Sequence, residues 1–200
     1  MTNAVLETLA RLVADLDSLD VGWALVGGLA VSTRVEPRFT RDVDVVVAAR
    51  SDGDAEQLIL RLQGLGYGVA SLVEQGYLGR IATVRMLPPS GSGVVVNLLF
   101  ASSGVEPEIV AGAERLEILP GLDVPVAQSG HLVVLKLLAQ EPSRPQDAVD
   151  LHALRGALTS TDAAEVRRLA AEIVSRRFHR ERDLIALAEE YLSHAVEPGR

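Results

Sequence analysis

The chain has 200 residues, a formal net charge of −8 at neutral pH and 48% hydrophobic residues. This length and hydrophobic content suit one packed domain, or a core with an appended subdomain. The acidic balance argues against a surface that coats nucleic acid, although it leaves room for a local basic patch. The sequence contains no cysteine, which excludes disulfide bonds and thiolate metal sites.

The sequence gives no indication of a membrane partner. No uninterrupted apolar run is long enough to span a bilayer, and the first residues lack the basic segment that begins a signal peptide. We therefore expect a cytoplasmic protein. Of the 19 basic residues, 18 are arginine and one is lysine, Lys136, which draws attention to that single lysine.

The first 126 residues alternate between helix and strand patterns. Leucine and valine residues at helical spacing predict an amphipathic helix over residues 3–19, and Ser51 or Asp52 can cap a second helix. Further helices are expected over residues 28–36 and 106–113. Strands are expected over residues 21–26, 42–48, 67–73, 80–87, 94–100, 115–119 and 124–126, the last two at a sheet edge near Pro125.

From Ser129 onward the sequence shows several helix patterns and no clear strand, with the last two helices expected over residues 162–176 and 179–194. The predicted fold class is α+β, with a mixed β-sheet flanked by helices and a helical C-terminal half. A soft boundary near residue 127 divides a core of residues 1–126 from a helical region of residues 127–200, which we expect to complete the active site.

One stretch, residues 25–47, carries the first candidate site. An apolar strand ends at Gly27 and Gly28, where the backbone can turn tightly and approach a ligand closely. A second strand opens with Asp42 and Asp44, and residues two apart on a strand point to the same face. Two carboxylates side by side repel each other unless a cation lies between them.

Oxygen ligands of this kind suit Mg²⁺, which takes one or two protein carboxylates together with substrate phosphates. The alternative is a turn at which the two acidic side chains are simply solvated. The upstream glycines and the flanking Arg38 and Arg41 weigh against that alternative.

Gly27-Gly28 followed by Arg38-Phe-Thr-Arg-Asp-Val-Asp44 resembles the signature of the polymerase-β-like nucleotidyltransferase superfamily. The resemblance implies that the two glycines contact nucleotide phosphates and that the two aspartates bind the metal. The form Arg-X-Thr-X-Asp-X-Asp is similar to the AbiEii/AbiGii (MenT-like) toxin branch. It is also similar to some aminoglycoside nucleotidyltransferases, so the motif indicates the chemistry better than the substrate.

A second group of candidate residues lies beyond the boundary. Lys136 occupies a strongly apolar helix pattern, where an ammonium must reach water, pair or lose its charge. It either faces the polyphosphate or occupies an edge position. Asp147 and Asp150 share one face of the next helix, whose start Ser143 and Gln146 can cap. The alternative for these acids is a favourable interaction with the helix dipole.

Lys136-Leu-Leu-Ala and Arg144-Pro-Gln-Asp-Ala-Val-Asp-Leu151 resemble the C-terminal motifs of AbiEii-type toxins. In that family the lysine and the first aspartate of the later motif are needed for activity, which implies catalytic roles for Lys136 and Asp147. Asp150 matches a second acid. The resemblance further implies transfer of a nucleoside monophosphate from a nucleoside triphosphate (NTP) to the 3′ end of tRNA, which blocks translation, by a toxin with a cognate antitoxin.

The same resemblance extends to phosphate contacts and regulation. Arg38 and Arg41 are expected to contact phosphates. Some antitoxins of the branch are kinases, and Thr40, two residues before Asp42, is a candidate phosphosite. A phosphate there would add about −1.5 to −2 charges beside the metal site and compete with the nucleotide.

One position departs from the superfamily pattern. The strand over residues 94–100, expected to be buried on both faces, carries Asn97 where a third carboxylate often lies. An amide can coordinate through oxygen but is a poor general base. Either the correspondence is off, another group serves, or the enzyme is degenerate; an asparagine that bonds to neighbouring backbone is an equal alternative. Two rival functions therefore remain: an O-nucleotidyltransferase for small molecules such as aminoglycosides, and a binding protein without catalysis.

The remaining polar residues of the C-terminal half are expected to be structural. A dense run of arginines between residues 167 and 182 predicts a solvated face paired with glutamates, with an RNA-phosphate patch as the minority alternative. The four histidines show no metal-ligand spacing.

Overall fold

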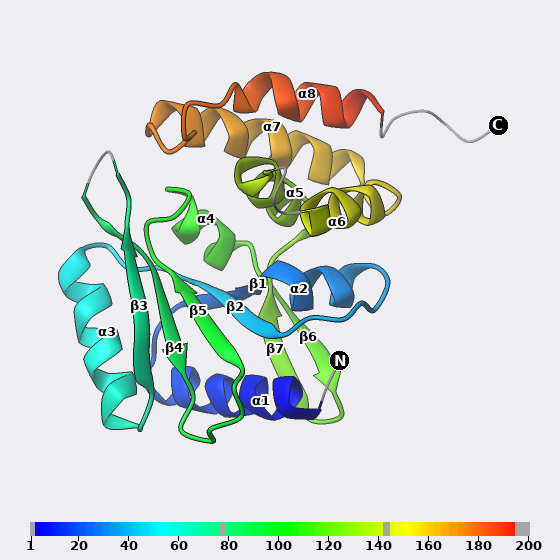
Figure 1. Ribbon diagram of the computed structural model, residues 1–200. Coiled ribbons are helices and arrows are strands. Elements are labelled where there is room, and N and C mark those ends of the chain that lie inside the picture. Colours follow the sequence, from blue (N-terminus) through cyan, green and yellow to red (C-terminus); the bar gives the residue numbers. More distant parts are fainter. Residues whose placement is uncertain (1–2, 77–78, 142–144, 195–200) are drawn as a thin grey trace.

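The computed structural model describes residues 3–76, 79–141 and 145–194, and it contains one mixed sheet (Figure 1). Its strands in these residues are β1 (Trp23–Val26), β2 (Asp42–Val47), β3 (Gly68–Glu74), β4 (Ile81–Leu87), β5 (Val95–Leu99), β6 (Glu114–Leu119) and β7 (Leu122–Val126). The helices are α1 (Asn3–Ser18), α2 (Gly27–Arg34), α3 (Asp52–Gly64), α4 (Glu106–Ala111), α5 (Ser129–Ala139), α6 (Pro145–Arg155), α7 (Ser160–Ser175) and α8 (Leu184–Ser193).

The strand order in the sheet is β3-β4-β5-β2-β1-β7-β6. The β2–β5 and β1–β7 pairs are parallel, and the other neighbouring pairs are antiparallel. This mixed sheet with flanking helices confirms the α+β class. It also places β2 near the middle of the sheet, between β1 and β5, where its side chains are held on both sides by paired strands.

The expected edge position of residues 124–126 is wrong. β7 lies between β1 and β6, with Leu25 opposite Val126 on one side and Arg115 opposite Pro125 on the other. Proline cannot donate a backbone hydrogen bond, so it favours edge strands. Here the contact with β1 is made at Val126, one residue beyond the proline. Pro125 is therefore tolerated in a strand that lies inside the sheet.

The strand over residues 94–100 is buried on one face rather than on both. Val96 and Leu98 are fully buried, whereas Val95, Asn97 and Leu99 on the opposite face are only half-buried. Because alternate residues of a strand point to opposite faces, Asn97 projects to the more open side. The apolar residues on both sides of Asn97 give no sign in the sequence that one face of the strand is more open than the other.

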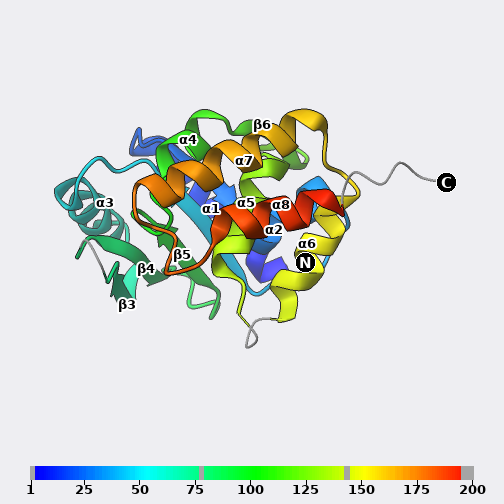
Figure 2. The same cartoon turned by 90° about the horizontal axis from the view of Figure 1, so that it is seen from above.

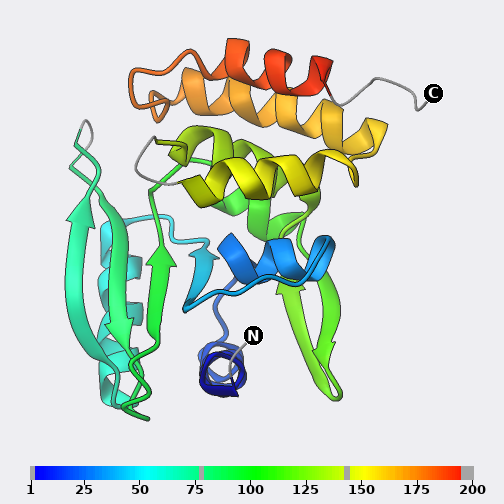
Figure 3. The same ribbon diagram turned by 45° about the vertical axis from the view of Figure 1, so that its right-hand side comes forward.

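The helices of the C-terminal part lie together at one end of the sheet. Figure 1 shows α5–α8 stacked above the strands, with α2 between the stack and the sheet. Figure 3 shows the same layers from the side, and the view from above in Figure 2 shows α7 and α8 crossing over α5. α2 packs against β1, β2, α5 and α6, so it joins the two parts.

The last helix begins later than expected. α8 starts at Leu184, and Asp183 caps it by accepting a 3.0 Å hydrogen bond from the backbone N–H of Ala186. The preceding segment cannot be helical because Arg177, Arg180 and Glu181 have positive φ angles of 65°, 52° and 59°. The capping box expected from Ser143 lies outside the described residues.

One hydrophobic core runs through both parts of the chain. Val43 and Val45 of β2 and Leu132, Val166 and Leu192 of the C-terminal helices belong to a single cluster of buried side chains. The division near residue 127 therefore separates a sheet from a helical stack without separating two cores. Within the described residues, every helix is too short or too polar to cross a membrane.

Candidate active site

The two aspartates of the first motif lie on the open face of β2. Asp42 and Asp44 are half-buried, while Val43 and Val45 between and beyond them are fully buried on the other face. The period of two residues that places both carboxylates on one side is the expected geometry of a strand. Val43 and Val45 anchor this geometry in the core.

Gly27 brings the backbone against Asp44. It is the first residue of α2 and has a φ of +65°, a conformation that favours glycine. A Cβ at this position would lie 2.0 Å from Asp44 Oδ2. Within the described residues no side chain caps the N-terminus of α2 at Val26, and Asp44 lies against the first residue of this helix. A helix N-terminus of this kind attracts anions.

Asn97 stands directly beside Asp44. The two residues are paired in the parallel register of β2 and β5, and Asn97 Nδ2 donates a 2.7 Å hydrogen bond to Asp44 Oδ1. Asn97 Oδ1 is buried and has no hydrogen-bond partner among the described residues. The amide thus holds one carboxylate oxygen of Asp44 in place.

Across from these residues lies a group of four charged side chains, of which the two aspartates are buried and the two cations are half-buried. Lys136 Nζ is 2.7 Å from Asp147 Oδ1 and 2.7 Å from Asp150 Oδ2. Arg38 Nε lies 2.6 Å from Asp150 Oδ1, and Arg38 Nη2 donates a 2.8 Å hydrogen bond to Asp150 Oδ2. The aspartate side chains are 3% and 1% exposed, so each charge is compensated by its neighbours rather than by water.

This network connects the two halves of the chain. Arg38 comes from the segment before β2, Lys136 from α5, and the two aspartates from α6. Asp150 forms ion pairs with both cations. Lys136 therefore forms ion pairs inside the protein. The alternative interpretation, in which Lys136 is a solvated edge residue, is wrong.

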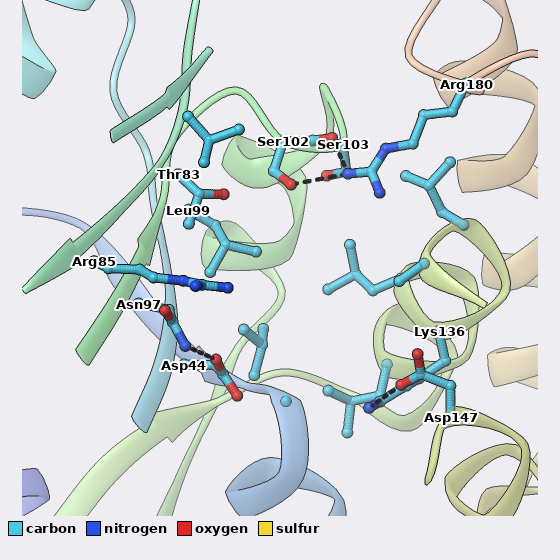
Figure 4. A pocket seen from close by; sticks show the side chains of 17 residues that line it. Asp44, Thr83, Arg85, Asn97, Leu99, Ser102, Ser103, Lys136, Asp147 and Arg180 are labelled. Carbon is cyan, nitrogen blue, oxygen red and sulfur yellow. Dashed lines mark hydrogen bonds and ion pairs between the residues drawn. The ribbon is translucent and has the colours of Figure 1, made fainter. Parts of the chain in front are cut away.

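A cavity of about 330 Å³ lies between the two groups (Figure 4). Gly27, Asp44 and Asn97 line one side, and Lys136 and Asp147 line the other. The structure thus brings together four residues that the sequence motifs predicted from positions up to 120 residues apart: Gly27, Asp44, Lys136 and Asp147. A volume of this order, roughly 300–1,000 Å³, is typical of sites for small molecules and cofactors.

The other predicted residues lie around this cavity and are not among its described lining residues. Gly28 packs against Arg38, since a Cβ on Gly28 would lie 2.5 Å from Arg38 Nη2. Arg41 is exposed, and its guanidinium lies 5.6 Å from the centre of the exposed ring of Phe39. Thr40 is 8% exposed, and its hydroxyl donates a 3.5 Å hydrogen bond to the carbonyl of Asp42.

Sequence reasoning missed several residues of the cavity wall. Arg85 and Thr83 on β4 line it, as do Ser102 and Ser103, which follow β5. Arg180 also lines it, although the sequence placed this arginine on a solvated face. An exposed arginine in an alternating strand gives no local signal of function; only the register that sets Arg85 opposite Asn97 reveals it.

Two side chains hold the loop that contains Ser102 and Ser103, which we call the serine loop. Glu106 accepts hydrogen bonds from the backbone N–H groups of Ser102 and Ser103, at 2.9 and 2.6 Å. Burial raises the pKa of Glu106, against the opposing effect of these bonds. Arg180 Nη2 donates to the carbonyl and the hydroxyl of Ser102, at 3.0 and 3.2 Å. Both contacts keep the loop at the mouth of the cavity.

Arg167 and Arg168 of the C-terminal run are paired with glutamates, as expected. Arg167 binds Glu189 with two hydrogen bonds of 2.8 and 3.1 Å, and Arg168 binds Glu165. The structural role expected for the histidines holds for buried His131, which contacts Glu165 at 3.2 Å and the backbone N–H of Gln128 at 3.4 Å.

The oxygen atoms beside Gly27 fit a small divalent cation. Asp42 and Asp44 share one face of β2, and Asn97 holds one oxygen of Asp44 in place. Hard oxygen donors of this type suit Mg²⁺, which keeps several positions for water and substrate phosphates. The described residues contain no cluster of three or more histidine, aspartate or glutamate side chains around one point, so the protein would supply part of the coordination shell.

Comparisons with solved structures identify the fold. The chain superposes on an antigenic nucleotidyltransferase-like protein from Paracoccidioides brasiliensis with a TM-score of 0.52 and 20% identity, covering 94% of each chain. It superposes equally well on the antibiotic-resistance factor ANT(2″)-Ia, with a TM-score of 0.52 and 20% identity, covering 94% of this chain and 98% of that one. At this level of identity the similarity establishes the nucleotidyltransferase fold alone.

Sequence comparison adds the family. Among curated proteins no sequence matches the chain. The family model described as nucleotidyl transferase AbiEii toxin, type IV toxin–antitoxin system, matches residues 9–197, which include both halves of the cavity. The chain therefore belongs to the AbiEii family of nucleotidyl transferase toxins.

Proposed function

We propose that this protein transfers a nucleoside monophosphate from an NTP to the 3′ end of tRNA, with Mg²⁺ as its metal, and so blocks translation. The observation that carries the proposal is the cavity itself. Its carboxylate side, at Gly27 and Asp44, faces Lys136 and Asp147 across a space of nucleotide-site size. The tRNA acceptor and the need for Mg²⁺ rest on the resemblance of the motifs to the toxin branch.

In the proposed reaction an acceptor hydroxyl attacks the α-phosphate of the nucleotide. A bond forms between the hydroxyl oxygen and the α-phosphorus, the bond between that phosphorus and the bridging oxygen breaks, and pyrophosphate leaves. Asp42 and Asp44 would hold Mg²⁺, which would neutralise charge and align the phosphates. The backbone at Gly27 approaches the phosphates where no Cβ intervenes.

The opposite wall supplies a cation and a carboxylate. Lys136 carries a compact positive charge that stabilises negative charge on the leaving pyrophosphate. Asp147, at 2.7 Å from Lys136 Nζ, fixes the position of that ammonium and is the candidate acceptor for the hydroxyl proton. Arg38 acts through Asp150, which it shares with Lys136.

Label transfer tests the proposal. Purified protein is incubated with Mg²⁺, total tRNA and each α-labelled NTP in turn. We expect label on tRNA that is lost in Asp42→Ala and Lys136→Ala and kept in a surface control, Glu56→Ala on α3, whose side chain is exposed. Label on an aminoglycoside instead of tRNA would show that the acceptor is a small molecule. No label on any acceptor would favour a binding protein without catalysis.

We also propose that a cognate antitoxin, acting as a kinase, phosphorylates Thr40. The added charge of about −1.5 to −2 would lie next to Asp42 and repel the nucleotide. Thr40 is buried at 8% exposure, so the segment before β2 must open for the kinase. Intact mass after co-expression with the neighbouring gene, for the wild type and Thr40→Val, tests this. An unmodified Thr40 in an inactive pair would rule it out.

A further inference from the structure

The positively charged side chains around the cavity are not equally available to a ligand. In the described part of the chain, Arg85, Lys136 and Arg180 line the cavity. Lys136 pairs with Asp147 and Asp150, and Arg180 donates to Ser102. Arg85 has no hydrogen bond or ion pair with any described residue. Among the described residues that line the cavity, Arg85 is thus the cation without a hydrogen-bond or ion-pair partner.

Arg85 lies one strand away from the carboxylate group. It is paired with Asn97 in the antiparallel register of β4 and β5, and Asn97 is paired with Asp44 in the parallel register of β5 and β2. These three residues therefore form a row across neighbouring strands. Figure 4 shows the Arg85 side chain extending along the cavity wall above Asn97 and Asp44.

The amide at position 97 gives Arg85 no charged partner on the neighbouring strand. A carboxylate there would lie directly opposite the guanidinium and pair with it, because opposed residues in neighbouring strands are in contact. Asn97 is neutral, and its side-chain N–H group donates a hydrogen bond to Asp44. The row therefore has a carboxylate at one end and, within the described residues, a guanidinium without a charged partner at the other.

We propose that Arg85 binds the triphosphate of the incoming nucleotide. A guanidinium presents several N–H groups in one plane and contacts phosphate oxygens in a two-point geometry. Because Asn97 separates it from Asp44 in this row, the guanidinium would hold phosphate oxygens that the metal site does not. This inference rests on the proposed function for the identity of the ligand as an NTP, and it does not depend on the acceptor.

The test is equilibrium binding without an acceptor. The four α,β-methylene NTPs, which cannot undergo transfer, are titrated with Mg²⁺ into the wild type, Arg85→Gln and Arg85→Lys by isothermal calorimetry. Loss of one charge-assisted contact weakens binding by about tenfold to a hundredfold. We expect a loss of that size in Arg85→Gln, a smaller loss in Arg85→Lys, and no loss for the matching nucleoside monophosphate.

Arg50→Gln is the matched control, because the Arg50 side chain is 95% exposed and lies outside the lining of the cavity. Arg85 is exposed and lacks partners in the described residues, so Arg85→Gln should unfold at the wild-type temperature. An unchanged affinity of Arg85→Gln for the methylene nucleotide that the wild type binds would overturn the inference. So would an effect confined to the KM for tRNA, which would assign Arg85 to the acceptor.

The two proposals can fail separately. Binding of a methylene nucleotide that depends on Arg85, together with no label transfer to tRNA, would support the role of Arg85 and refute the acceptor. Label transfer with full affinity in Arg85→Gln would do the reverse. If the wild type bound none of the four methylene nucleotides, both proposals would be wrong.

Discussion

Gly27 and Asp44 are in such close contact that the structure has no room for a side chain between them. A Cβ on Gly27 would lie 2.0 Å from Asp44 Oδ2 and 2.6 Å from Asp44 Cγ. The carboxylate that we place at the metal is therefore positioned by the backbone of the turn into α2. The glycine of the motif is required both for its conformation and for this contact.

Gly27→Ala should abolish transfer while leaving the protein folded. The added methyl group must displace the Asp44 carboxylate, and misplacing a reacting group by 1 Å costs about a hundredfold in rate. We expect at least that loss in label transfer to the acceptor.

Gly91→Ala separates the effect of contact from that of backbone strain. Gly91 has a φ of +64°, almost the same as at Gly27, but a Cβ there meets nothing within 4 Å. Both variants pay the strain of a positive φ, about 1–2 kcal/mol. Equal activity losses in the two variants would contradict the role given to Gly27.

Asp150→Asn should destabilise the fold strongly. Asp150 is 1% exposed and compensates both Arg38 and Lys136. Removing its charge takes the carboxylate partner from Arg38 and leaves Lys136 with Asp147 alone, and breaking a buried pair costs about 3–5 kcal/mol. The free energy of unfolding, measured in urea, should fall by about that amount.

The exposed pair of Arg167 and Glu189 provides the comparison. Both side chains are about half-exposed, so Glu189→Gln should cost less than about 1 kcal/mol. If Asp150→Asn cost no more than Glu189→Gln, the buried network would not be the connection between the sheet and the helical stack that we describe.

How much of this site the sequence could predict depends on the range of the interactions. The alternation that places Asp42 and Asp44 on one face, and the glycine turn before them, are local patterns. The spacing of Asp147 and Asp150 on α6 is local as well. These features were predicted because strand and helix periods are fixed by backbone geometry.

Contacts between distant segments could not be predicted in the same way. Arg38 and Asp150 are 112 residues apart in the sequence, and the expectation that Arg38 binds phosphate took no account of this partner. Arg85 meets Asn97 only through the register of β4 and β5, which alternation in a single strand does not specify. The internal position of β7 has the same cause, since a proline indicates an edge only until a neighbouring strand is known.

Stability should fall as the pH is lowered below 6.5 because of His131. Burial lowers the pKa of His131 from 6.5, and Glu165 opposes this only in part. Below about pH 6.5, His131 binds a proton in the unfolded chain but stays neutral in the folded protein. The contribution of the neutral His131 to folding stability is therefore complete above pH 6.5. It is lost as the pH falls through the pKa of His131 in the folded state. One unit below, at pH 5.5, the loss is at most about 1.4 kcal/mol.

Urea unfolding at pH 7.5 and 5.5 measures this loss. The wild type should lose stability between these two values, and His131→Gln should lose less, because the glutamine does not titrate. The lowered pKa of Glu165 acts below 4.5 and lies outside this window. Parallel losses in the two proteins would show that other groups control the acid sensitivity.

Gly104→Ala should loosen the upper wall of the cavity. Gly104 has a φ of +77°, and a Cβ there would lie 2.5 Å from the buried ring of Phe178. Arg176 donates to the Gly104 carbonyl, and Arg180 donates to Ser102, so the segment around Phe178 and the serine loop hold each other. Displacing the ring should release both contacts and weaken nucleotide binding as well as the fold.

Gly121→Ala is the matched variant for this prediction. Gly121 has a φ of +79° in the turn between β6 and β7, and a Cβ there meets nothing within 4 Å. Both variants carry the strain of a positive φ, about 1–2 kcal/mol, but Gly104→Ala adds the clash with Phe178. The melting temperature should therefore fall further in Gly104→Ala, and the affinity for the α,β-methylene NTP should fall in that variant alone. Equal nucleotide affinity in the two variants would mean that the serine loop and Arg180 do not contribute to the nucleotide site.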